Sequence, residues 1–339
     1  MSVTIVFGGQ YGDEGKGKVA HFFAVKEKAK YCVRVGGVNS DHTVYRGNER
    51  VLFHILPTGS IEKNVKAVLP AGTYIDINLL KEEMRISELS DDRLLIDENA
   101  VIISTTEKTK EETSDLQKRI GSTNSGTGAG VIERVSRNSD KILAKNCHQL
   151  KQYVVDTKSI LRQACSNNEK IIIEGTQGYG LSVLHAKDYP YVTSRDTSAA
   201  GALSETGLSP FDVENIVMVI RAFPIRVAGN SGPLKNEISW DIIKNELGVT
   251  SDITEFTSCT NMVKRIARFD AEIVKRSLEC NKPNIIVLNH MDYIDYTINN
   301  KSVLSSLAKK YLLEVKRDIQ NDIHYVGTGK TELLYVGKV

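Results

Sequence analysis

The chain has 339 residues, of which 41% are hydrophobic and 25% are charged, as in an ordinary globular protein. No apolar run reaches the roughly 20 residues needed to span a bilayer, and a net charge of +2 lacks the basic excess of a nucleic-acid-binding protein. Five widely spaced cysteines without a CxxC pair, and a start without a signal-peptide pattern, predict reduced thiols and a cytoplasmic location.

Short β-branched runs alternate with charged stretches of helical period, which predicts an α/β fold with a mostly parallel central sheet flanked by helices. We expect a single domain, 1–339, with loop insertions. A helix is expected over Val19–Lys28, and the clearest strands are Val3–Phe7, Ile171–Ile173, Asn215–Ile220 and Asn284–Leu288. A second apolar run covers Tyr31–Val35. A polar segment follows each strand, and ligands of such sheets bind at the carboxyl ends of the strands.

The first of these segments, GGQYGDEGKGK over residues 8–18, follows a strand and opens a helix. Its N–H groups and the helix dipole can hold a phosphate, so the segment is P-loop-like. Val19 stands where a P-loop has its magnesium-binding hydroxyl, which makes Asp13 a candidate metal ligand or base. A plain tight turn is the other interpretation, but two lysines and two carboxylates exceed what a turn needs.

Two further segments carry polar side chains suited to chemistry. Asn39–Thr43 combines an amide, a carboxylate and an imidazole, and His42 is our candidate acid, although a lone histidine is more often structural. Between Arg119 and Arg137 lies IGSTNSGTGAGVIERVSR, which is too rich in glycine to predict a packed helix. We expect a mobile binding loop there.

These motifs, together with EGTQG, YPYVTS, NHMD and VGTGKTE, resemble the adenylosuccinate synthetase family in order and approximate spacing. The resemblance spans Val3 to about Glu332 and is to the short archaeal and phage form. It implies a magnesium-dependent, nucleotide-binding ligase and a homodimer. A base takes the N1 proton of a 6-oxopurine nucleotide, O6 attacks the γ-phosphate of ATP or GTP, and the amine of L-aspartate displaces phosphate from C6.

The resemblance also implies roles for individual residues. Asp13 is implied as base and metal ligand, His42 as acid, and Lys16 as phosphate ligand and catalytic residue. Asp41 is our second candidate metal ligand. The nucleoside triphosphate is assigned to Gly12, Gly15, Lys16, Gly17, Lys18, Asp292, Thr328, Gly329 and Lys330. The substrate nucleotide is assigned to Asn39, Thr123, Gln177, Thr193 and Arg137, the last lent by the other subunit. L-Aspartate is assigned to Thr257, Ser258, Thr260, Lys264 and Arg265.

The chain departs from the family where the amino acid binds. Met262 and Lys264 stand in the place of two arginines, of which the first reaches the ribose 2′-hydroxyl. Loss of that contact is what a deoxyribonucleotide site would tolerate. Asp41 replaces a glycine and could accept from an exocyclic amine. At the triphosphate pocket His290 replaces a lysine and Asp292 remains, which leaves ATP and GTP open as donors.

These departures favour dGMP as substrate, as in phage enzymes of the family that form the precursor of diaminopurine DNA, in which case the location is the host cytoplasm. IMP is the alternative, because Asp13 is retained. A GTPase-like switch would need a hydroxyl in place of Val19 and an intact guanine signature. An inactive relative acting as a scaffold is disfavoured by the retained polar residues of the motifs.

Overall fold

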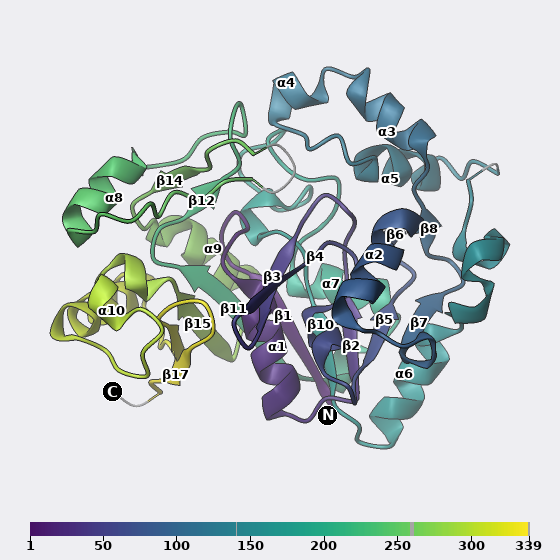
Figure 1. Cartoon of the computed structure of the whole chain (residues 1–339), viewed down its shortest axis with the longest axis horizontal. Helices are drawn as coiled ribbons and strands as arrows, with labels where there is room; N and C mark the ends of the chain where they lie inside the picture. Colours follow the sequence, from purple (N-terminus) through teal and green to yellow (C-terminus); the bar gives the residue numbers. More distant parts are fainter. Residues whose placement is uncertain (140, 258–260, 338–339) are drawn as a thin grey trace.

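The computed structural model describes residues 1–139, 141–257 and 261–337. A ten-stranded sheet forms its centre, in the order β17-β16-β15-β11-β1-β10-β2-β5-β7-β9 (Figure 1). All neighbours are parallel except β16 and β17. Its strands are β1 Val3–Gly8, β2 Tyr31–Arg34, β5 Lys66–Leu69, β7 Leu94–Asp97, β9 Val154–Val155, β10 Ile171–Glu174, β11 Val213–Arg221, β15 Ile285–Asn289, β16 Tyr325–Gly327 and β17 Leu333–Tyr335.

Helices cover both faces of this sheet, so the α/β prediction is confirmed. They are α1 Lys16–Lys26, α2 Ile77–Ser87, α3 Thr105–Glu112, α4 Leu116–Ile120, α5 Thr127–Val135, α6 Thr157–Ser166, α7 Ala199–Thr206, α8 Trp240–Leu247, α9 Ala271–Asn281 and α10 Ser306–Ile319. Smaller sheets pair β3 His42–Arg46 with β4 Glu49–Phe53, β6 Tyr74–Ile75 with β8 Val101–Ile102, and β12 Ile225–Arg226 and β13 Glu237–Ile238 with β14 Arg265–Ala267. None of the helices in the described ranges is long and apolar enough to cross a membrane.

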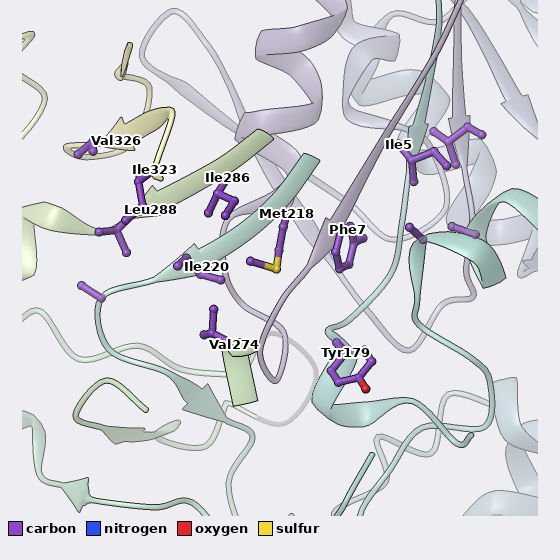
Figure 2. Close-up of a cluster of buried hydrophobic side chains, with 14 of the residues drawn as sticks. Ile5, Phe7, Tyr179, Met218, Ile220, Val274, Ile286, Leu288, Ile323 and Val326 are labelled. Carbon is purple, nitrogen blue, oxygen red and sulfur yellow. The ribbon is translucent and has the colours of Figure 1, made fainter. Parts of the chain in front are cut away.

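The four strands predicted from the sequence and the apolar run Tyr31–Val35 correspond to the five adjacent central strands β15, β11, β1, β10 and β2. Every residue of β1, β2 and β10 is buried, as expected of parallel strands covered on both faces. Alternate side chains of β1 point to opposite faces of the sheet. Ile5 and Phe7 lie with Met218, Ile220 and Ile286 in one cluster, shown in Figure 2, whereas Val6 packs on the side of α1.

The prediction of a mobile loop between Arg119 and Arg137 is wrong for its second half, because α5 forms there. Gly126, at φ 83°, precedes the helix, and its N–H donates to Glu111 Oε2 over 2.8 Å. The N–H of Ala129 donates to Glu111 Oε1 over 3.0 Å. A buried carboxylate from α3 thus takes up the free N–H groups of the first turn, which outweighs the low helix propensity of glycine. Figure 1 shows α3, α4 and α5 side by side.

Candidate active site

The loop between β1 and α1 is shaped around the carboxylate of Glu14, which is fully buried. Its Oε1 accepts from the N–H groups of Gln10 at 3.1 Å and Gly12 at 2.8 Å, and its Oε2 accepts from Lys16 Nζ at 2.8 Å. Gly15, at φ 83°, precedes α1, and a Cβ there would lie 2.9 Å from Asn289 Nδ2. The helix begins at Lys16, three residues before the predicted Val19. The loop therefore presents Lys16 and the N-terminus of α1 to the same space.

His42, at the start of β3, is held by two charged residues that the sequence analysis did not identify as functional. Its Nδ1 contacts Glu174 Oε1, and Arg34 Nη1 lies 2.8 Å from Nδ1 and 3.1 Å from Nε2. Burial, with Arg34 and Lys16 nearby, lowers the pKa of His42 well below its ordinary value, and burial raises the pKa of Glu174. A charged residue at the end of a buried strand was the available sequence signal, since Arg34 ends β2 and Glu174 ends β10.

Asp13 belongs to a closed ring of four charged residues. Lys264 Nζ donates to its Oδ1 over 2.8 Å and lies 3.6 Å from Glu255 Oε2. Arg221 completes the ring by donating to Glu255 Oε1 over 2.7 Å and to the carbonyl oxygen of Asp13 over 2.8 Å. Burial raises the pKa of Glu255, but Arg221 and Lys264 bring it down to about 2. Glu255 and Arg221 were also not identified from the sequence; Arg221 ends β11, whose last five residues are buried.

A cavity of about 540 Å³ opens at the carboxyl ends of the central strands. A second hollow of about 250 Å³ shares Asp13, Asn39, Asp41 and Thr123 with it. The larger cavity brings together many residues predicted from the sequence, namely Gly12, Asp13, Lys16, Asn39, Asp41, His42, Thr123, Gln177 and Thr193. The smaller hollow adds Thr257, Met262 and Lys264.

Some predicted site residues lie elsewhere. Arg137 is exposed and lines neither cavity. Arg265 is engaged by Glu237 through two hydrogen bonds of 2.8 and 2.6 Å, and it donates to the carbonyl oxygen of Gly232 over 2.7 Å. Ser258 and Thr260 are outside the described residues. The predicted aspartate-binding group is therefore represented at the cavity by Thr257 and Lys264.

The residues predicted for the triphosphate lie around the start of α1 and the end of β16. Lys18 Nζ donates to the carbonyl oxygens of Gly329 at 2.9 Å and Glu332 at 3.5 Å, and burial lowers its pKa to about 8. Asp292 is buried, which raises its pKa, and its Oδ1 has no hydrogen-bond partner within the described part of the chain. Lys330 lines a separate hollow of about 350 Å³ together with Lys18.

No group of three or more histidine, cysteine or acidic residues that could hold a metal occurs within 1–139, 141–257 and 261–337. Magnesium usually takes only one or two protein carboxylates and completes its shell with water and substrate phosphates. Asp13 and Asp41 lie on the shared wall of the two cavities and suit that kind of site.

Comparison with known proteins gives a consistent result. A family model described as adenylosuccinate synthetase matches residues 5–145 and 139–299. Adenylosuccinate synthetase of Methanococcus aeolicus is 33% identical, over 97% of this chain and 97% of that protein, and the one of Archaeoglobus fulgidus is 31% identical, over 97% and 96%.

Two solved structures share the fold. Fully ligated adenylosuccinate synthetase from Plasmodium falciparum has a TM-score of 0.84 at 21% identity and covers 99% of both chains. Succinoaminodeoxyadenylate synthetase (PurZ) of cyanophage S-2L, bound to dGMP and to dATP as an energy donor, has a TM-score of 0.83 at 26% identity, over 98% of this chain and 95% of that chain.

Proposed function

Because the chain belongs to the adenylosuccinate synthetase family, whose ligases join aspartate to a purine nucleotide, we propose that it joins L-aspartate to C6 of IMP at the cost of a nucleoside triphosphate. The observation that carries this proposal is the convergence of Asp13, Lys16, His42 and Gln177 on one cavity of about 540 Å³. That volume is in the range of small-molecule sites.

The arrangement supports two steps. Asp13 takes the proton from N1, O6 bonds to the γ-phosphorus and the bond to the nucleoside diphosphate breaks. The amine of aspartate then attacks C6, loses a proton and expels the phosphate. Lys16 and the N-terminus of α1 offset the negative charge of the transferred group. His42, held in place by Glu174 and Arg34, faces the same cavity, where we propose that it assists the transfer of that group.

Magnesium fits this scheme. Asp13, and Asp41 beside it, would hold the ion together with phosphate oxygens of the donor. A bound Mg²⁺ supplies charge neutralisation to the transferring phosphoryl group.

IMP is supported by the archaeal relatives, which are named adenylosuccinate synthetase and align with this chain over nearly their whole length. Two residues favour dGMP as a second candidate. Asp41 adds a carboxylate to the cavity wall, where it could accept from the 2-amino group, and Met262 lines the adjoining hollow without offering a polar contact to a 2′-hydroxyl.

Phosphate release with L-aspartate, magnesium and either nucleotide tests this choice. Activity confined to IMP supports the proposal, and activity confined to dGMP establishes the second candidate. In the latter case Asp41→Gly should lower kcat/KM for dGMP more than kcat/KM for IMP, and Met262→Arg should favour the ribonucleotide. Each of the two substitutions should change the preference by about tenfold or more, because each alters one hydrogen bond to the substrate.

For the phosphoryl donor we propose GTP, with ATP as the alternative. Buried Asp292, whose Oδ1 has no partner among the described residues, supports guanine, because the N1–H and 2-amino groups of guanine can both donate to a carboxylate. Competition between the two triphosphates in the same assay decides between them. A preference for ATP would remove Asp292 from base recognition.

We further propose that residues 1–339 act as one cytoplasmic domain and that two copies form a homodimer. Arg137 then reaches the 5′-phosphate site of the partner, where Thr123 and Thr193 supply hydroxyl groups. The exposure of Arg137, and its absence from the walls of both cavities of its own chain, support a role across the interface. Neither a membrane nor a nucleic acid is expected as a partner.

A further inference from the structure

The candidate base Asp13 is paired with Lys264, the lysine expected to bind the amino acid. Lys264 Nζ lies 2.8 Å from Asp13 Oδ1, and both side chains line the hollow of about 250 Å³. A base must come within hydrogen-bond reach of the proton that it takes. In this structure, one oxygen of Asp13 is therefore engaged by an ammonium group.

The ammonium group has a second carboxylate within reach. Glu255 Oε2 lies 3.6 Å from Lys264 Nζ, and the other oxygen of Glu255 accepts from Arg221 at 2.7 Å and from the hydroxyl of Tyr293 at 3.1 Å. If the ammonium group leaves Asp13, the carboxylate of Glu255 still lies beside it, which avoids the cost of an isolated buried charge.

The main-chain N–H and carbonyl groups of this lysine are both hydrogen-bonded, which favours movement of its side chain over movement of its backbone. The N–H of Lys264 donates to the carbonyl oxygen of Glu255 over 2.9 Å, and its own carbonyl oxygen accepts from Trp240 Nε1 over 2.8 Å. The four-carbon stem of lysine can redirect the ammonium group between neighbouring carboxylates, whereas the planar fork of an arginine is less adaptable.

We propose that Lys264 couples the two substrates: it occupies Asp13 while the amino-acid site is empty, and it turns to a carboxylate of the bound amino acid, which frees Asp13 to accept the N1 proton. This inference rests on the proposed function. Its consequence is that the nucleoside triphosphate is not consumed without the amino acid, since the 6-phosphoryl nucleotide would otherwise react with water to give phosphate and the original nucleotide.

The test is phosphate release by the full chain with nucleotide, donor and magnesium but no L-aspartate. Lys264→Met should raise this release about tenfold over wild type, because a hydrogen bond to a charged group contributes at least about 1.5 kcal/mol, which corresponds to that factor. The substitution should also abolish the stimulation of phosphate release by aspartate. A purely structural role of Lys264 would lower the rate instead. Lys264→Arg, which keeps the charge beside Asp13, should keep the release low.

Lys118→Met is the matched control, because Lys118 lines the same hollow without pairing with Asp13. It should not raise release in the absence of aspartate. If Lys264→Met binds the nucleotide but releases no more phosphate than wild type, the inference is overturned while the proposed function stands. If wild type shows no aspartate-dependent release with any purine nucleotide, both are overturned.

A second measurement applies even if Lys264→Met fails to fold. A crystal structure of wild type with the nucleotide and L-aspartate should show Lys264 Nζ on a carboxylate of the amino acid and beyond hydrogen-bond distance from Asp13. Retention of the 2.8 Å contact in that complex would contradict the coupling.

Discussion

Lys16 Nζ donates to Glu14 Oε2 over 2.8 Å, and both side chains are almost completely buried. Because Glu14 also accepts two N–H groups of its own loop, this carboxylate fixes the loop before any phosphate arrives. Removing one partner of a buried pair leaves the other charge uncompensated.

Glu14→Gln should therefore lower the free energy of unfolding by about 3–5 kcal/mol. Urea denaturation followed by circular dichroism measures this. Glu62→Gln serves as control, since Glu62 is in a partly exposed pair with His21 and should lose less than about 1 kcal/mol. Equal losses in the two variants would show that the loop does not depend on its buried carboxylate.

Asp13→Ala should abolish turnover and spare nucleotide binding, because the base is lost while the residues around the nucleotide remain. Loss of a general base lowers the rate by about 10²–10⁴-fold. Phosphate release and calorimetric titration with the nucleotide monophosphate test the two halves of this prediction. Undiminished turnover would remove Asp13 from the role of base.

Glu174→Gln should lower kcat about 100-fold with little change in the KM for the nucleotide, since Glu174 orients His42 and makes no proposed contact with substrate. The split between kcat and KM separates positioning from binding. His148→Asn, at an exposed position outside the site, should retain wild-type kinetics. A rise in KM alone for Glu174→Gln would argue that His42 binds substrate without assisting phosphoryl transfer.

Mixing the inactive variants Asp13→Ala and Arg137→Ala tests the exchange of Arg137 between subunits. In the mixed dimer one site combines an intact Asp13 with an intact Arg137 from the other chain. Random reassortment of equal amounts should restore about a quarter of wild-type activity. Activity that stays at the level of the separate variants would show that Arg137 acts within its own chain or not at all.

Lys18 predicts a specific pH dependence of stability. Burial lowers its pKa from 10.5 to about 8, so between these values the unfolded chain binds more protons than the folded chain. The contribution of Lys18 to the free energy of unfolding should therefore rise as the pH rises from about 8 to about 10.5. Urea denaturation of wild type and Lys18→Met across this window measures the effect, and parallel curves would contradict it.

The sequence by itself determined the central strands, because parallel strands buried on both faces must be continuous apolar runs, as in β1 and β10. It also predicted polar segments that line the cavity, since these segments follow those strands. It could not determine α5, whose glycines favour a loop until Glu111 of α3 takes up the N–H groups of its first turn.

Only the tertiary structure decided which charges meet at the site. Asp13 and Lys264 are separated by 251 positions in the chain, and Glu174 is 132 positions from His42. Such pairs leave no periodic pattern in a single sequence, because their partners are set by the order of strands in the sheet and by how the connecting segments fold back onto it. The residue types were readable from the sequence, but their pairing, and with it the pKa of each group, depends on the folded chain.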